Sequence, residues 1–160
     1  MSVKDIYWLY EVLLSRIYLF LHPHLWGKHI GINGLPRIDG IRYLDLGDNV
    51  YINNKVYIQC SEKGSVKIGH CVTLSYDCVI LTSGVETINY PRNCMVRGRK
   101  HSFGRVLIGD GVWLGARSVV LPGVTIADKI VVGAGSVVTK NLDKEGWLYA
   151  GVPAKPIKAL

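Results

Sequence analysis

The side chains best suited to chemistry gather in one basic segment. His101 stands beside Arg97, Arg99 and Lys100, and residues 87–109 contain no acidic residue. Histidine titrates near neutral pH, so it is the usual group for taking a proton from a reacting hydroxyl. The guanidinium groups favour an anionic reactant. We expect His101 to be a general base, and Arg97 and Arg99 to contact a negatively charged substrate; the alternative for His101 is an exposed loop residue.

A second basic group stands near the C-terminus. Lys140, Lys155 and Lys158 follow the last repeats described below, where they would steer in a ligand with several negative charges. An ordinary solvated face is the alternative. The whole chain of 160 residues has 19 basic and 12 acidic residues, a net charge of +7. No nucleic-acid-reading motif accompanies this charge, so no nucleic-acid partner is expected.

The cysteines indicate neither a metal site nor a disulfide scaffold. The four thiols contain no C-x-x-C pair, so reduced cysteines in a cytoplasmic protein, with no metal, are expected; they are Cys60, Cys71, Cys78 and Cys94. Nothing marks Cys94 as an activated thiolate, so no acyl-enzyme is expected. The N-terminus has no basic leader or cleavage site, and Glu11 and Arg16 interrupt its apolar residues. A signal peptide and a membrane span are therefore not expected.

A period of six residues organises most of the chain. Aliphatic residues recur at this spacing in three frames: Leu46, Ile52 and Ile58; Ile68, Leu74 and Ile80; and Ile108, Leu114, Val120, Ile126, Val132 and Val138. Turn formers follow these positions, and small or apolar residues occupy the fifth positions. Three such units close a triangular coil of 18 residues, and stacked coils pair their backbones and bury an aliphatic column. The pattern predicts an all-β parallel β-helix prism of about four coils.

Two breaks interrupt the period. Ile58 and Ile68 are ten residues apart, and Ile80 and Ile108 are twenty-eight apart, so the second break must extrude a loop, about residues 86–105. Before the prism, residues 3–21 predict a mostly apolar helix. We therefore divide the chain into an N-terminal helical cap, 1–27, and a β-helix domain, 28–160. The helix is expected to cap the prism and pack on a neighbouring subunit, or to lie on a membrane surface.

The segment from Ile108 to Lys158 resembles the C-terminal half of acetyl-CoA-dependent sugar O-acetyltransferases. Its motifs are IGDGVWLGARSVVLPGVTIADKIVVGAGSVVTKNL and AGVPAKPIK. The hexapeptide pattern extends the likeness to the hexapeptide acyltransferases from about Leu46 onward. This resemblance implies a left-handed β-helix, an exception to the usual right-handed crossovers. It also implies a homotrimer that binds acetyl-CoA between neighbouring prisms.

The resemblance also implies contacts to acetyl-CoA. The Trp beside the acetyl group matches Trp113, with core or subunit packing as the alternative. The backbone contacts match Ala116 and Ala134, the residues near the nucleotide match Thr139 and Lys140, and the basic residues near the phosphates match Lys155 and Lys158. Tyr51 and Asn53 match acceptor-binding positions. Their alternatives are an outward strand residue for Tyr51 and a turn residue for Asn53.

The catalytic base departs from the pattern of the maltose and galactoside enzymes. Val85 stands where they carry a histidine, which argues against membership in that subgroup. His101, at the far end of the same loop, resembles the histidine that serine and polysaccharide acetyltransferases carry before the next coil. His70 stands at a turn, where exposure is expected. Which carboxylate would orient His101 stays open among Glu62, Asp77 and Glu86.

These observations predict an acetyl-CoA-dependent sugar O-acetyltransferase. The basic loop favours an anionic or carrier-linked saccharide, as used in cell-surface polysaccharide biosynthesis. One alternative is a serine acetyltransferase-like or other small-molecule enzyme. The other is a non-enzymatic β-helical scaffold subunit, in which the cofactor motifs are inherited features of the fold. The protein is expected in the cytoplasm, with contact to the inner membrane surface through its helix if that helix lies on lipid.

Overall fold

The fold is a prism with three faces. A computed structural model describes residues 9–10, 12–13, 16–18, 20–22, 28–86 and 99–160. Face A contains β1 (Ile30–Ile32), β4 (Val50–Ile52), β7 (Thr73–Leu74), β12 (Trp113–Leu114), β15 (Val131–Val132), β17 (Trp147–Ala150) and β18 (Lys155–Ala159). Face B contains β2 (Arg37–Asp39), β5 (Tyr57–Gln59), β8 (Val79–Ile80), β13 (Val119–Val120) and β16 (Val137–Val138). Face C contains β3 (Leu44–Leu46), β6 (Val66–Ile68), β11 (Val106–Ile108) and β14 (Thr125–Ile126).

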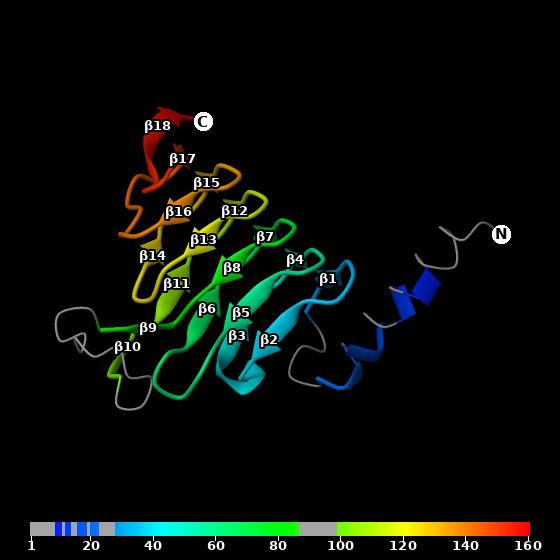
Figure 1. The fold of residues 1–160 in the computed structure, drawn as a ribbon. Coiled ribbons are helices and arrows are strands. Elements are labelled where there is room, and N and C mark those ends of the chain that lie inside the picture. The colour runs from blue at the N-terminus through cyan, green and yellow to red at the C-terminus, as the bar shows by residue number, and fades with distance from the viewer. Residues whose placement is uncertain (1–8, 11, 14–15, 19, 23–27, 87–98) are drawn as a thin grey trace.

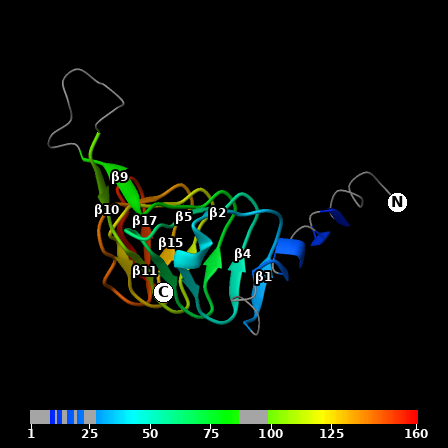
Figure 2. The ribbon, with the colours of Figure 1, turned by 90° about the horizontal axis from the view of Figure 1, so that it is seen from below.

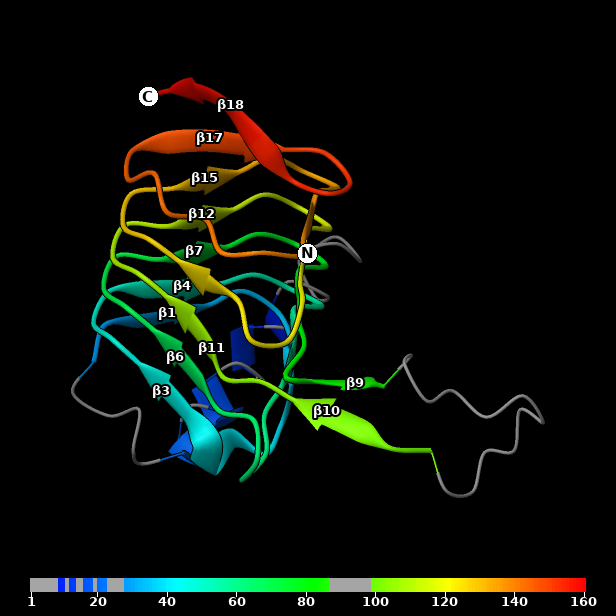
Figure 3. The same ribbon diagram turned by 90° about the vertical axis from the view of Figure 1, so that its left-hand side faces the viewer.

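Each coil visits the three faces in turn. Figures 1 and 3 show the strands stacked like rungs, with the N-terminal end of the prism at one end of the stack and β18 at the other. Trp113 pairs with Val131, and Val119 pairs with Val137, so neighbouring coils are 18 residues apart. All strand pairs between coils are parallel, and the antiparallel pairs are β9 with β10 and β17 with β18 among the named strands. The predicted parallel prism is confirmed.

The core contains the residues that the period placed inside. All twelve aliphatic leads are at most 3% exposed, and the fifth positions are at most 4% exposed, including the polar Ser118 and Ser136. Burial of each large aliphatic side chain contributes roughly 1.5–3 kcal/mol. The thiol of Cys78 lies in this column and donates to the carbonyl of Gly115 over 3.1 Å. The column therefore stabilises the stack along its whole length.

Two strands precede the repeats that the sequence identified. They are β1 and β2, which complete the first coil together with β3, the strand that contains Leu46; β1 pairs with β4 and β2 pairs with β5. A short 3-10 helix, η2 (Ile41–Tyr43), separates Ile38 from Leu46. Because this helix lengthens the spacing from six residues to eight, the prediction of the first repeat at Leu46 was late by two repeats.

The extruded loop has an ordered stem. β9 (Ser83–Val85) and β10 (His101–Phe103) form an antiparallel hairpin that leaves the prism between faces B and C. Figure 2 shows it projecting from one corner of the prism. The stem lengthens the predicted loop by a few residues, because its first strand begins before residue 86.

The predicted N-terminal helix is only partly described. Helical residues occur at 9–10, 12–13, 16–18 and 20, beyond the β1 end of the prism (Figure 1). Leu9, Leu13 and Ile17, each four residues apart, are 45–57% exposed. Burial raises the pKa of Tyr18 to about 12, with a smaller effect from Cys60, which follows β5 in the second coil. Among the described residues, no helix is long and apolar enough to cross a bilayer. The cap and the membrane contact stay predictions.

Candidate active site

Tyr51 and Trp113 lie on the outer side of face A, in one column with Thr73 between them. Tyr51 pairs with Thr73, and Thr73 pairs with Trp113, so the three side chains project from successive rungs. Tyr51 is 45% exposed and Trp113 is 52% exposed. The ring of Tyr51 covers Gly31, where an added Cβ would come within 2.3 Å of the ring. Two aromatic surfaces are therefore presented to solvent on one face.

The edge between faces A and B, called the AB edge, carries three of the predicted cofactor contacts. The indole Nε1 of Trp113 donates to the hydroxyl of Ser75 over 2.8 Å, which turns the ring toward this edge. Ala116 and Ala134 occupy successive turns there, and the backbone N–H of Gly135 donates to the carbonyl of Ala116 over 2.8 Å. Ser75 was not predicted as a site residue. The sequence feature that could have indicated it is a small polar residue in the coil before the tryptophan, just after the strand that pairs with the strand of Trp113.

Lys155 extends the same edge at the C-terminal end of the prism. It pairs with Ala150, whose methyl group lies close to Gly133. The N–H of Gly151 donates to the hydroxyl of Ser136 over 3.0 Å, which fastens the connection before β18. Lys158 pairs with Leu148 farther along β18. Trp113, Ala116, Ala134 and Lys155 therefore follow one edge of the prism.

Thr139 and Lys140 lie on a different edge. They follow β16, at the end of face B, on the edge between faces B and C, called the BC edge. Both are exposed. Five residues separate the AB edge at Ala116 from the BC edge at Leu121, which is roughly 16 Å of extended chain. The expectation that Lys140 clusters with Lys155 and Lys158 is therefore wrong within one chain, because the width of face B separates the two edges.

Asn53 is used within the prism. It is 7% exposed, and its Nδ2 donates to the carbonyl of Leu74 over 3.0 Å. Its Oδ1 accepts from Nδ2 of Asn33 over 3.3 Å. These contacts support the alternative of a turn residue. Acceptor binding by Asn53 stays a prediction, whereas the hydroxyl-bearing Tyr51 is open to solvent.

His101 lies on the BC edge, on the second strand of the hairpin. It pairs in register with Val85, and Ser102 pairs with Gly84. His101 is exposed, and no hydrogen bond joins its imidazole to any residue that the structure describes. The N–H of Glu86 donates to the carbonyl of Lys100 over 3.0 Å and extends the stem.

The basic residues of the loop are described only in part. Arg99 is half-buried beside the stem, whereas Arg97 and Cys94 lie outside the described residues. Asp77 lies on the AB edge, in a left-handed turn conformation with a φ of 59°. Glu86 follows β9 directly, and Glu62 lies in the turn between β5 and β6. Which of these carboxylates orients His101 stays open.

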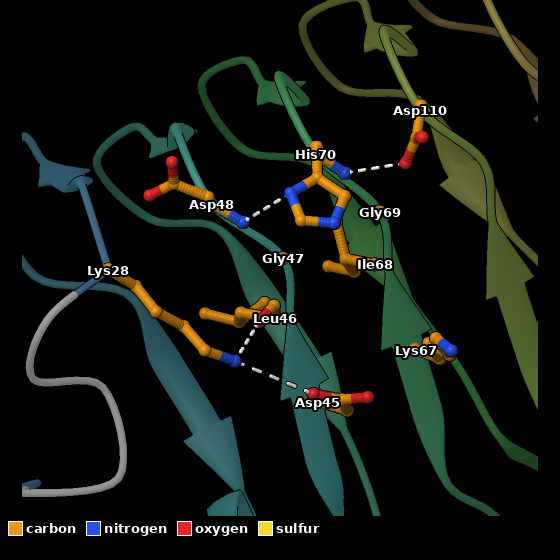
Figure 4. A pocket seen from close by; sticks show the side chains of 10 residues that line it. All are labelled: Lys28, Asp45, Leu46, Gly47, Asp48, Lys67, Ile68, Gly69, His70 and Asp110. Atoms are coloured by element: carbon orange, nitrogen blue, oxygen red, sulfur yellow. Dashed lines mark hydrogen bonds and ion pairs between the residues drawn. The ribbon is translucent and has the colours of Figure 1, made fainter.

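A polar cavity of about 480 Å³ lies on the third edge, between faces C and A. Figure 4 shows His70 above it, with Nδ1 accepting from the N–H of Asp48 over 3.0 Å. The N–H of His70 donates to Asp110 over 2.7 Å, and the N–H of Asp110 donates to Asp128 over 2.8 Å. Lys28 pairs with Asp45 over 3.7 Å. Because these polar groups form hydrogen bonds and ion pairs mainly with one another, they connect successive coils along this edge and have a structural role.

Two of the described cysteines, Cys60 and Cys78, are buried and offer no reactive centre, whereas Cys71 is exposed at a turn. Burial raises the pKa of the Cys60 thiol to about 11, and burial also raises the pKa of Cys78. Both thiols therefore stay protonated near neutral pH. Within residues 28–86 and 99–160 and the described helical residues, no group of His, Cys, Asp and Glu could hold a metal ion.

The chain is similar in sequence and in structure to known acetyltransferases. A family profile described as "Hexapeptide repeat of succinyl-transferase" matches residues 105–140. The galactoside O-acetyltransferase of Escherichia coli (strain K12) is 32% identical over 122 residues, which cover 74% of this chain and 58% of that protein. The structure of a maltose O-acetyltransferase from Clostridium difficile 630 matches with a TM-score of 0.72 and 29% identity, covering 83% of this chain and 67% of that chain.

A third match contains a ligand. The structure of a galactoside acetyltransferase in complex with coenzyme A matches with a TM-score of 0.69 and 28% identity, covering 81% of this chain and 64% of that chain. By its repeats and its fold, this chain belongs to the hexapeptide-repeat family of left-handed β-helix proteins. The chain spans 54% to 60% of the length of the curated relatives it matches.

Proposed function

We propose that this protein is an acetyl-CoA-dependent O-acetyltransferase that acts on a saccharide hydroxyl. The observation that carries the proposal is the continuous AB edge from Trp113 through Ala116 and Ala134 to Lys155. An indole suits the acetyl and thioester end of the donor, and backbone groups at small residues suit its pantetheine. A lysine at the far end suits its phosphates. Lys158 adds a second positive charge on the same strand.

The protein is proposed to work as a homotrimer. His101, Thr139 and Lys140 belong to the BC edge, whereas Trp113 and Ala134 belong to the AB edge, so one chain alone separates them by the width of face B. If the B faces of three prisms meet around a threefold axis, the AB edge of one subunit lies beside the BC edge of the next. Face B presents Val79, Val119 and Val137 outward in one row, which suits such contact.

The proposed reaction is a direct transfer. His101 takes the proton of the acceptor hydroxyl as its oxygen bonds to the thioester carbonyl carbon. Backbone N–H groups hold the oxyanion that forms, the carbon–sulfur bond then breaks, and coenzyme A leaves as its thiolate. The thiolate takes the proton back from His101, so the products are the acetyl ester and free coenzyme A, and no acyl-enzyme or metal ion is required.

The acceptor is proposed to be an anionic or carrier-linked saccharide of cell-surface polysaccharide biosynthesis, acetylated in the cytoplasm. Arg97, Arg99 and Lys100 stand next to His101 in the sequence and would attract such an acceptor. Tyr51 and Asn53 are the proposed acceptor contacts on the AB edge. Exposed Tyr51 is the better placed of the two for binding a sugar ring.

The test is acceptor-dependent release of the coenzyme A thiol from acetyl-CoA. The panel contains neutral sugars, acidic sugars, their nucleotide- and lipid-linked forms, and serine. We expect release with an anionic or carrier-linked saccharide. Fastest release with serine would place the protein among small-molecule acetyltransferases. Failure to bind acetyl-CoA at millimolar concentration would contradict the enzyme proposal and favour a scaffold.

A further inference from the structure

The first break in the hexapeptide period lies beside the second. The four extra residues between Ile58 and Ile68 form a turn in which Ser61 and Gly64 exchange backbone hydrogen bonds of 2.8 and 3.1 Å. This turn connects β5 and β6 on the BC edge, where β9 leaves the prism on the next coil. The extra residues therefore lie where the extruded hairpin begins.

Gln59, the last residue of β5, binds the start of the hairpin. Its side-chain oxygen Oε1 accepts from the N–H of Thr82 over 3.3 Å and from the N–H of Ser83 over 3.1 Å. It also accepts from the hydroxyl of Ser83 over 3.0 Å. The hydroxyl of Thr82 donates to the backbone carbonyl of Gln59 over 2.9 Å. One side chain thus fixes two consecutive residues where the chain departs from the prism.

The turn of residues 61–64 packs closely against the start of the hairpin. Thr82 is fully buried, and a Cβ added at Gly64 would come within 2.7 Å of its side chain and 2.8 Å of its carbonyl oxygen. The ammonium of Lys63 lies 5.7 Å from the ring centroid of Phe103, on the returning strand. The N–H of Gly104 donates to the carbonyl of Thr82 over 2.9 Å. Both strands of the hairpin are therefore held at their base.

We infer that Gln59, together with the 61–64 turn, is a positioning element for the catalytic hairpin: it fixes the direction in which β9 and β10 carry His101. The inference rests on the proposed function for its catalytic consequence, since His101 must act as the base. Gln59 itself lies at the root of the hairpin, where it contacts Thr82 and Ser83, so it positions the base without touching the reactants. Misplacement of a catalytic group by about 1 Å costs roughly 100-fold in rate.

The experiment compares Gln59→Leu with Gln59→Glu in the full chain. Leucine keeps the size of the side chain and removes the acceptor, whereas glutamate keeps an oxygen that can accept all three hydrogen bonds. In Gln59→Leu we expect faster amide hydrogen exchange in residues 83–86 and 99–103, with unchanged exchange in β13 and β16. We expect kcat to fall by roughly 10- to 100-fold while KM for acetyl-CoA stays the same. Gln59→Glu should restore both.

Each outcome decides the inference. Unchanged hairpin exchange in Gln59→Leu overturns it, as does an equal loss of protection throughout the prism, because that would mean general destabilisation. Faster hairpin exchange with unchanged kcat shows that the hairpin is held by Gln59 but does not carry the base, which also overturns the positioning role. If the wild type proves inactive with every acceptor, or if His101→Ala keeps full activity, the proposed function fails instead. The comparison of hydrogen exchange between the two Gln59 variants then still shows whether Gln59 holds the base of the hairpin.

Discussion

His101 lies directly opposite Val85 across the β9–β10 ladder. Directly paired residues of antiparallel strands point to the same side, with Cβ atoms about 4.5–5.5 Å apart. Val85 is the position at which the maltose- and galactoside-type enzymes are expected to carry their histidine. The imidazole of His101 therefore projects from the same side of the hairpin as the side chain at that position. The proposed base His101 therefore starts from a position directly beside Val85 on the neighbouring strand.

This register predicts that the base can be moved back. His101→Ala should lower kcat by roughly 10²- to 10⁴-fold, the usual contribution of a general base. Adding Val85→His to that variant should restore part of the loss, because the new imidazole starts from the paired position. Initial rates of thiol release with saturating acetyl-CoA measure both. Val85→His in the wild type is the control, and full activity of His101→Ala would remove His101 from the mechanism.

Trp113 is predicted to determine affinity for the donor. Trp113→Ala should raise KM for acetyl-CoA about tenfold, equivalent to about 1.4 kcal/mol, because the aromatic surface beside the AB edge is lost. Trp113→Phe keeps a ring and loses only the hydrogen bond to Ser75, so its KM should rise less. Steady-state kinetics at a fixed acceptor concentration give these values. An unchanged KM in Trp113→Ala would assign the indole to packing.

Face B is predicted to be the subunit interface. Val119→Lys places a charge in the middle of its outward row, and the cost of burying that charge should dissociate the trimer. Leu107→Lys is the matched control, since Leu107 projects outward from face C. Light scattering should give a trimer for the wild type and for Leu107→Lys, and a smaller species for Val119→Lys. A monomeric wild type would contradict the proposed assembly.

Asp39 is predicted to make stability depend on pH at the acidic end. The hydroxyl of Tyr57 donates to its carboxylate over 2.7 Å, and this bond, followed by that from Arg37, lowers the pKa of Asp39 below its ordinary 3.8. A lowered folded-state pKa stabilises the fold above pH 3.8, and this stabilisation disappears as the pH falls through the folded value. Tyr57→Phe should therefore be less stable than the wild type at neutral pH.

The difference should shrink as the pH falls below 3.8, because protonated Asp39 gains little from either partner. Thermal unfolding between pH 7 and pH 2 measures it, with Tyr51→Phe as the control on the neighbouring strand of the same coil. A difference in Tm that stays constant over this range would mean that Tyr57 stabilises the coil by packing alone.

Much of the prism follows from the sequence because a period of six can be satisfied in few ways. Residues such as Leu114 and Val120 had to be inside, and their neighbours had to turn, so the core and coil length could be predicted. The first two repeats, on β1 and β2, were missed because η2 lengthens the next spacing by two residues. The likeness of the segment after Ile108 also identified Trp113 and Ala134, which the structure brings to one edge.

The edges on which the other site residues lie could not be predicted from the period. Lys140 and Lys155 are close in the sequence, yet they lie on different edges because the chain runs along faces C and A between them. His101 lies opposite Val85 because the register of the hairpin stem pairs them. The hydrogen bonds from Thr82 and Ser83 to Gln59 form because the two insertions, after Ile58 and after Ile80, leave the prism on the same edge in successive coils. The sequence by itself therefore determined which side chains are inside and where the chain turns. Only the tertiary structure decided which outward residues meet, because insertions shift the register between coils that are distant in sequence.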